Sequence, residues 1–167
     1  GSKPLYFQDS VQYVTASPGV GKTHLAIALG IKACMARYRV AFYLARDLVD
    51  YLYSSLADLS TAAKLEQLSR IHLLIIDELG YLSLDKERAT LFFQLVSKRY
   101  ETGSIILTTN VPFTQWDTIF GDQVIASAIL DRLAHHCHIF TINGHSYRMK
   151  DKLKPGQRGV TVAAEER

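Results

Sequence analysis

A glycine-rich stretch between an apolar run and an amphipathic segment holds the residues best suited to chemistry. Residues 16–23 read A-S-P-G-V-G-K-T, close to the phosphate-loop pattern G-x-x-x-x-G-K-[ST] that joins a strand to a helix. Ala16 takes the first glycine position and is small enough to keep the bend. Gly19 and Gly21 can adopt positive φ, so consecutive backbone N–H groups can point at an anion. A helix that begins directly after the loop adds its positive end, and the stretch therefore predicts a nucleotide-phosphate site.

Two side chains of this stretch have separate predicted roles. Lys22 can place its charge on the β- and γ-phosphates of ATP, and Thr23 can supply an oxygen ligand to Mg²⁺. We expect the nucleotide to be held by the loop and the residue after it, namely Ser17, Pro18, Gly19, Val20, Gly21, Lys22, Thr23 and His24.

An acid pair follows a second apolar run, in the stretch L-L-I-I-D-E-L-G-Y-L. Asp77 ends the run, where it can hold Mg²⁺ through water. Glu78 comes next and can accept a proton from a water that attacks the γ-phosphate. A nucleoside kinase must exclude water and has no use for such a glutamate, so the pair favours hydrolysis.

A third polar position follows the run I-I-L-T-T-N. Ligands of open α/β sheets lie beyond the carboxyl ends of the strands, so Asn110 is expected near the γ-phosphate, where it could orient the attacking water. The alternative interpretation is a turn residue, since Val111 and Pro112 follow. No N-K-x-D motif follows a strand in the sequence, which argues against a GTPase.

Alternating strands and helices must position these residues. Periodicity predicts strands over residues 11–15, 40–45, 71–77, 104–109 and 138–142, and helices over 22–36, 46–69 (with a polar interruption), 85–102 and 123–136. This alternation implies a parallel sheet with helices on both faces. We expect one domain over residues 11–152, a tag or linker remnant over 1–10, and a basic, disordered tail over 153–167.

Composition and charge restrict the class of protein. The 167 residues are 48% hydrophobic and 21% charged, and no apolar run has the length of a membrane span. The two cysteines and the absence of a signal-peptide pattern predict a reduced, cytoplasmic protein without a membrane partner. Residues 148–158 carry a net charge of +4 against +3 for the whole chain, which is a candidate contact for DNA phosphates or else a solvated tail. The stretch H-H-C-H at 135–138 is expected to be structural, because four consecutive residues do not converge easily on one ion.

Several stretches together resemble the IstB-like branch of AAA+ ATPases, the helper ATPases of insertion-sequence transposition and relatives of the DnaC helicase loaders. They are P-G-V-G-K-T-H-L-A-I-A-L-G, L-L-I-I-D-E-L-G-Y-L-S-L-D, L-F-F-Q-L-V-S-K-R-Y-E-T-G-S-I-I-L-T-T-N, F-G-D-Q-V-I-A-S-A-I-L-D-R-L-A-H-H and S-Y-R-M-K. The resemblance implies an AAA+ P-loop core with a five-stranded parallel sheet in the order 5-1-4-3-2 and no helical lid. It also implies Mg²⁺-dependent ATP hydrolysis, homo-oligomers formed through the ATP site, binding to duplex DNA, and assistance to the transposase of the same element.

The resemblance also implies roles for single residues. Lys22 and Thr23 match the first Walker motif, and Asp77 and Glu78 match the second. Asn110 matches the polar sensor of the fourth strand.

Two arginines are matched as well. Arg132 matches the arginine finger that reaches the nucleotide of a neighbouring subunit, and Arg148 matches a second sensor that contacts the nucleotide. Arg132 has an alternative interpretation as a surface arginine favoured by the dipole at a helix C-terminus. In the resemblance the long segment 46–69 holds a helical insertion that faces DNA, although its mixed charges do not by themselves indicate DNA contact.

Three other functions stay open at this level. A DnaC-like replicative helicase loader would have the same site and a different client. A phosphate-loop small-molecule kinase would need an acceptor before it turned over ATP. A nucleotide-dependent DNA-binding module would assemble with ATP without useful turnover.

Overall fold

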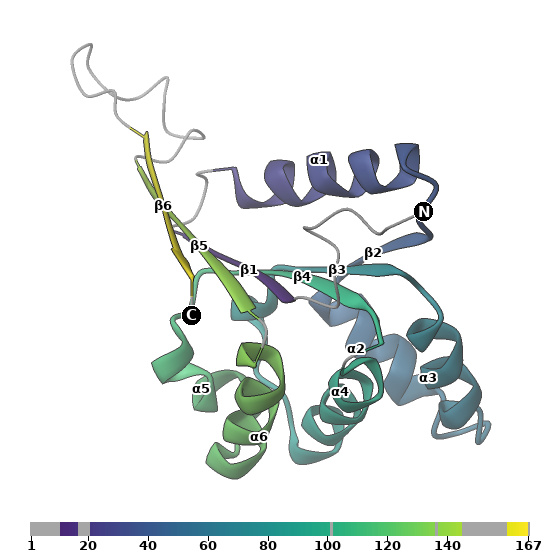
Figure 1. Ribbon diagram of the computed structural model, residues 1–167. Helices are drawn as coiled ribbons and strands as arrows, with labels where there is room; N and C mark the ends of the chain where they lie inside the picture. The colour runs from purple at the N-terminus through teal and green to yellow at the C-terminus, as the bar shows by residue number, and fades with distance from the viewer. Residues whose placement is uncertain (1–10, 17–20, 101, 136, 145–159, 167) are drawn as a thin grey trace, which may run out of the picture.

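One mixed sheet forms the centre of the molecule (Figure 1). The computed structural model describes residues 11–16, 21–100, 102–135, 137–144 and 160–166. The strands are β1 (Val11–Ala16), β2 (Val40–Leu44), β3 (Leu73–Asp77), β4 (Ser104–Thr109), β5 (Cys137–Gly144) and β6 (Val160–Glu166). Their order in the sheet is β2-β3-β4-β1-β5-β6. Strands β1 to β5 are parallel, and β6 pairs antiparallel with β5.

The sixth strand differs from the sequence-based expectation. Five strands were expected, and residues 153–167 were expected to form a disordered tail, which does not hold for residues 160–166. The open edge of β5 explains the difference, because β1 occupies only its other edge and an unpaired edge accepts a further strand. The segment begins V-T-V, which is β-branched and suited to pairing. Residues 145–159, which include the whole basic stretch 148–158 that was expected to contact DNA, lie outside the described residues.

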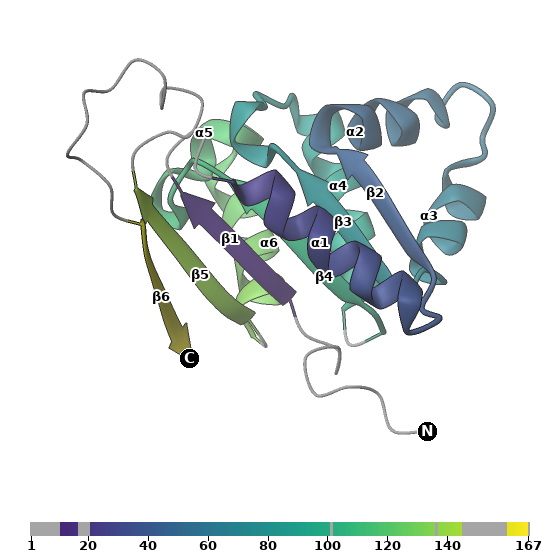
Figure 2. The same cartoon turned by 90° about the horizontal axis from the view of Figure 1, so that it is seen from above.

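The helices are distributed unequally over the two faces of the sheet. They are α1 (Lys22–Met35), α2 (Ala45–Ser54), α3 (Thr61–Ser69), α4 (Lys86–Arg99), α5 (Asp117–Phe120) and α6 (Gln123–Ala134), with 3₁₀ turns η2 (Leu79–Tyr81) and η3 (Phe113–Gln115). Helix α1 lies on one face and α2 to α6 lie on the other (Figures 1 and 2). The expected helical segment 46–69 is two helices, α2 and α3. No helix among the described residues is both long and apolar enough to cross a membrane.

Aspartate caps fix where two of these helices begin. Asp85 accepts the backbone N–H of Arg88 at 2.8 Å at the start of α4. Asp122 accepts the N–H groups of Val124 and Ile125 at 2.8 and 2.9 Å at the start of α6. Each cap satisfies N–H groups that have no partner inside the helix.

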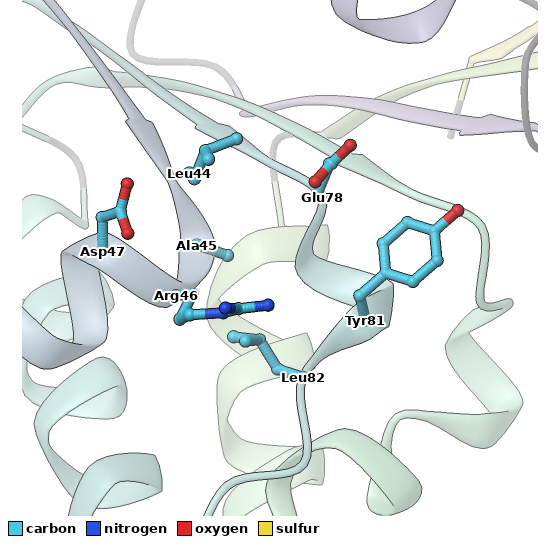
Figure 3. Close-up of a pocket in the computed structure, with 7 residues that line it drawn as sticks. All are labelled: Leu44, Ala45, Arg46, Asp47, Glu78, Tyr81 and Leu82. Carbon is cyan, nitrogen blue, oxygen red and sulfur yellow. The ribbon is translucent and has the colours of Figure 1, made fainter.

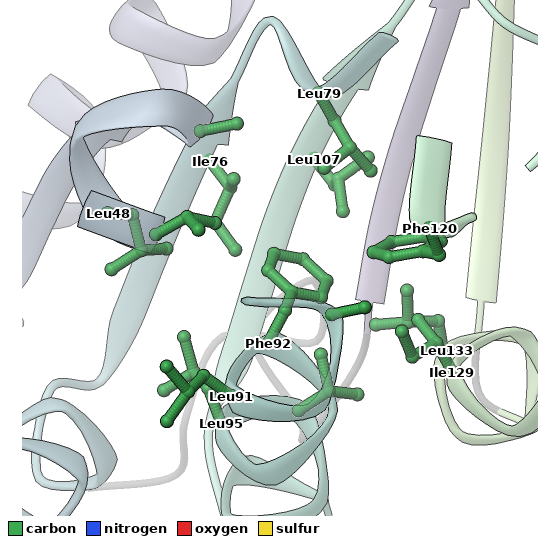
Figure 4. Close-up of a cluster of buried hydrophobic side chains, with 14 of the residues drawn as sticks. Leu48, Ile76, Leu79, Leu91, Phe92, Leu95, Leu107, Phe120, Ile129 and Leu133 are labelled. Atoms are coloured by element: carbon green, nitrogen blue, oxygen red, sulfur yellow. The ribbon is translucent and has the colours of Figure 1, made fainter. Parts of the chain in front are cut away.

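The larger hydrophobic core lies between the sheet and the helices α2, α4 and α6, which cover one of its faces (Figure 4). Its centre includes Phe92 of α4, Phe120 of α5 and Ile129 of α6, all with 0% of their surface exposed. All five residues of β3 are buried, as the continuous apolar run predicted.

On the opposite face, α1 packs closely against the sheet. A Cβ at Gly30 would lie 2.8 Å from Cδ1 of Ile75 in β3, so a larger residue there would require the Ile75 side chain to shift. Helix α1 begins directly after Gly21, which places Lys22 and Thr23 in its first turn.

A buried arginine connects three elements of the larger face. Arg99 is 1% exposed, and its Nη1 donates to the carbonyl oxygens of Leu68 and Ile71 at 2.5 and 3.0 Å. Its Nη2 donates to the carbonyl of Ser104 at 2.8 Å. Burial lowers the pKa of Arg99 to about 10, so the guanidinium stays protonated near neutral pH. The side chain thereby ties the end of α4 to the end of α3 and the start of β4.

We predict that Arg99→Met lowers the free energy of unfolding by about 3 kcal/mol, because three carbonyls lose their donor. Urea denaturation of this variant and of Lys86→Met, an exposed change in the same helix, measures the difference. Equal midpoints for the two variants would contradict the structural role of Arg99.

Candidate functional site

Lys22, Thr23, Asp77, Glu78 and Asn110 lie at the carboxyl ends of β1, β3 and β4. Helix α1 begins at Lys22, directly after Gly21, whose φ of 98° is the left-handed conformation expected of a phosphate-loop glycine. Lys22 and Thr23 are half-buried, whereas His24 is exposed. Ser17, Pro18, Gly19, Val20 and Arg148 lie outside the described residues, so their predicted contacts stay predictions.

The two predicted Mg²⁺ ligands are in direct contact. The hydroxyl Oγ1 of Thr23 donates to Oδ2 of Asp77 at 2.8 Å, and the Asp77 side chain is 1% exposed. A hydroxyl and a carboxylate are hard oxygen ligands of the kind Mg²⁺ prefers, with substrate phosphates and water completing its shell. Among the described residues no three His, Cys, Asp or Glu side chains form a metal cluster, so an all-protein cage is not present there.

A second hydroxyl completes the surroundings of the buried carboxylate. Thr108 of β4, 0% exposed, donates its Oγ1 proton to Oδ1 of Asp77. The same Thr108 oxygen accepts the backbone N–H of Glu78 at 3.0 Å. Both oxygens of Asp77 are therefore hydrogen-bonded, and one hydroxyl links the acid side chain to the backbone of the next residue.

Glu78 turns the chain away from the sheet. Its φ of 64° and ψ of 35° are left-handed, which is uncommon for a residue with a side chain and is found at functional sites. The Glu78 side chain is exposed and lies beside a pocket at the start of α2 (Figure 3). The pocket is lined by Leu44, Ala45, Arg46, Asp47, Glu78, Tyr81 and Leu82.

Asn110 lies against the turn that follows the acid pair. A Cβ at Gly80 would lie 2.0 Å from Oδ1 of Asn110, so the two segments touch through a glycine. Oδ1 of Asn110 is buried and has no hydrogen-bond partner among the described residues.

Other side chains hold the turn after β4. Oγ1 of Thr109 accepts the N–H of Val111 at 3.0 Å, and Nε1 of Trp116 donates to the Val111 carbonyl at 3.2 Å. These hydrogen bonds of the turn come from Thr109 and Trp116, and the predicted sensor role of Asn110 stays a prediction.

Arg132 is not brought to this cluster within one chain. It lies in the last turn of α6, which leads into the N-terminal end of β5, whereas the cluster lies at the carboxyl ends of the parallel strands. Its Nη1 donates to the Ala128 carbonyl at 3.2 Å, and its guanidinium carbon is 4.5 Å from the centre of the Phe93 ring. From this position Arg132 could act as the predicted arginine finger only on the nucleotide of a neighbouring subunit.

Sequence reasoning missed Thr108 and Gly80. The signal for Thr108 is a hydroxyl residue inside an otherwise apolar buried strand, since buried polar groups need hydrogen-bond partners. Gly80 sits within the acid-pair stretch, but its close approach to Asn110 depends on tertiary contacts that the sequence does not show.

The fold and this cluster define a phosphate-loop protein with an AAA+-like core. The "Crystal structure of the DnaC helicase loader" superposes with a TM-score of 0.63 and 23% identity, covering 75% of this chain and 76% of that chain. At this identity the likeness concerns the fold alone.

Sequence comparison gives the family. Residues 5–155 match the family model described as "IstB-like ATP binding protein". An insertion sequence IS21 putative ATP-binding protein from Pseudomonas aeruginosa is 51% identical over 139 residues, 83% of this chain and 52% of the relative. An IS232 putative ATP-binding protein from Bacillus thuringiensis subsp. berliner is 45% identical over 144 residues, 86% of this chain and 57% of the relative.

The chain belongs to the IstB-like ATP-binding protein family, which confirms the resemblance inferred from the motifs. It spans about half the length of the two relatives named above.

We predict that Thr108→Val weakens Mg²⁺-dependent nucleotide binding about 10- to 100-fold, a range typical for loss of a residue that orients a metal ligand. The isosteric valine removes one donor to Asp77 and one acceptor for the Glu78 N–H. Titration of a fluorescent ATP analogue at several Mg²⁺ concentrations measures the change.

Two variants control for general effects of this change. Thr108→Ser keeps the hydroxyl and should bind nearly as the wild type does. Ser97→Ala removes a buried hydroxyl oxygen elsewhere and should have no effect. If Thr108→Val binds as Thr108→Ser does, the hydroxyl link is not needed.

Proposed function

We propose that this chain is the ATPase domain of an insertion-sequence helper protein that oligomerises on duplex DNA and assists a transposase in target selection. The observation that carries the proposal is the contact between Thr23 and Asp77 with Glu78 directly beyond it, at the carboxyl edge of the sheet. Membership in the IstB-like family supplies the insertion-sequence context.

Each residue of the cluster has a role in hydrolysis under this proposal. Thr23 and Asp77 would hold Mg²⁺, which when bound neutralises charge on the β- and γ-phosphates of ATP. Lys22 would place its ammonium group on the same phosphates.

Glu78 and Asn110 would act on the attacking water. The Glu78 side chain, which is exposed and follows the buried Asp77 directly, accepts a proton from this water. Asn110 orients the water with its side-chain amide, whose oxygen is buried beside the same turn.

Oligomerisation would complete the site. An arginine added from a neighbouring subunit neutralises charge in the transition state and makes hydrolysis depend on assembly. Arg132 lies at the opposite end of the sheet from Glu78, so it could serve only in this way.

A helicase loader is the alternative for the same site. A helicase loader has a similar fold, as the likeness to the DnaC helicase loader shows, while the names of the two sequence relatives given above favour an insertion-sequence role. Pull-down with a transposase or with a hexameric helicase separates the two. A small-molecule kinase is less consistent with Glu78, which favours attack by water.

We predict that the wild type hydrolyses ATP, that duplex DNA raises the rate, and that specific activity rises with protein concentration. Glu78→Gln should keep ATP binding and lose at least about 100-fold in turnover, because the general base is removed. A phosphate-release assay with and without DNA measures both. Turnover that needs an added acceptor molecule would indicate a kinase instead.

We predict that two inactive variants, Arg132→Ala and Glu78→Gln, partly restore each other when mixed. Random assembly places an intact Glu78 opposite an intact Arg132 at about a quarter of the interfaces, so about a quarter of the wild-type rate should return. A mixture of Arg132→Ala with Lys22→Ala, which should behave in the same way, provides a second pair. Wild-type turnover by Arg132→Ala alone would remove the finger from the mechanism.

A further inference from the structure

Two loops lie side by side at the end of the sheet opposite the nucleotide site. The carbonyl of Arg39 accepts the N–H groups of His72 and Leu73 at 3.0 and 3.1 Å. The N–H of Arg39 donates to Nδ1 of His72 at 2.8 Å. The loop after α1 and the loop after α3 are therefore held together where β2 and β3 begin (Figure 2).

This end of the molecule presents a group of exposed basic side chains, which we call the basic end. Lys32 comes from the last turn of α1, Arg37 and Arg39 from the loop that follows it, and Arg70 from the end of α3. All four side chains are exposed. Four positive charges from three segments, namely the end of α1, the loop after it and the end of α3, are thus displayed at this end of the molecule.

Among the described residues, an acid near Arg70, Glu66, is already paired. Glu66 pairs with Arg70 at 3.2 Å and with Lys98 at 2.9 Å. Among the described residues no carboxylate pairs with Lys32, Arg37 or Arg39. The negative C-terminal ends of α1 and α3 favour cations at this end of the molecule. This dipole effect does not specify which positions the cations occupy.

Arg37 stands where folding alone favours glycine. Helix α1 ends in a Schellman motif, in which the N–H of Tyr38 bonds to the Ala33 carbonyl and that of Arg37 to the Cys34 carbonyl. The residue at this position is left-handed and is usually glycine, and Arg37 has a φ of 65°. Backbone strain kept at such a position points to a role for the side chain outside the fold.

We propose that the basic end binds the phosphodiester backbone of duplex DNA. Guanidinium groups on ordered loops match phosphate oxygens in charge and in hydrogen-bond geometry. The surface lies at the opposite end of the sheet from the Thr23–Asp77 contact, so DNA and nucleotide can be bound together. The inference rests on the DNA binding in the proposed function and assigns it a surface among the described residues.

Arg37→Gly tests the inference because stability and binding should change in opposite directions. Glycine relieves the left-handed strain, so the melting temperature should stay the same or rise by about 2–4 °C. Loss of one phosphate contact should lower affinity for a labelled duplex about fivefold at low salt. The slope of log affinity against log salt should become shallower by about 0.9.

Further variants make the result specific. Arg39→Gln, which leaves the backbone contacts with His72 in place, should shift the slope by a similar amount. Lys86→Gln removes the same charge at the other end of the sheet and should leave the slope near that of the wild type. Anisotropy titrations of the four proteins at several salt concentrations supply all the slopes.

The outcomes separate this inference from the proposed function. Wild-type protein that fails to bind duplex DNA with or without ATP would overturn both. If the wild type binds duplex DNA but Arg37→Gly and Arg39→Gln show the same salt slope as Lys86→Gln, the proposal that the basic end binds DNA is wrong. The proposed function is unaffected by that result. If single-stranded DNA or an acidic protein is bound through these residues while duplex is not, the choice of duplex DNA is wrong.

Discussion

The hydrogen bonds around the buried carboxylate of Asp77 are the constraint on which the site depends. A buried acid is costly unless its oxygens have partners, and here Thr23 from α1 and Thr108 from β4 supply one donor each. Both donors reach Asp77 because β3 lies next to β4 in the sheet and because α1 packs on β3. The strand order and the packing of α1 therefore together fix the positions of the predicted metal ligands.

The two ends of the sheet differ in chemistry because every strand of the parallel set runs the same way. The carboxyl ends carry the acids and the first turn of α1, while the amino ends carry Arg39 and the loop that leads from α3. Arg132 also lies away from the carboxyl ends, at the end of α6. Under the proposed function, a single chain would hold the phosphate-binding half of a site and, remote from it, Arg132, which would complete the site of another chain. This separation gives a physical reason why activity would require assembly.

Sequence reasoning reached most of the fold through periodicity, and it failed where pairing was decided by tertiary contact. The apolar run ending at Asp77 predicted a strand buried on both faces, because few other structures accept such a run. The same reasoning missed β6, since a short strand at a free edge is specified by the neighbour it meets rather than by its own pattern. The same was true of the site. Thr23 and Asp77 belong to motifs with a recognisable spacing, so the sequence predicted them. Thr108 is one hydroxyl residue within an apolar strand, so the sequence did not single it out.

Under the proposed function, Asn110 and Glu78 would be linked by packing. Oδ1 of Asn110 is buried and has no protein hydrogen-bond partner among the described residues. A Cβ at Gly80 would lie 2.0 Å from this oxygen, so the turn that follows Glu78 lies directly against the Asn110 amide. Any shift of Asn110 would therefore have to move the turn that begins at Glu78, which would couple the proposed sensor to the proposed general base.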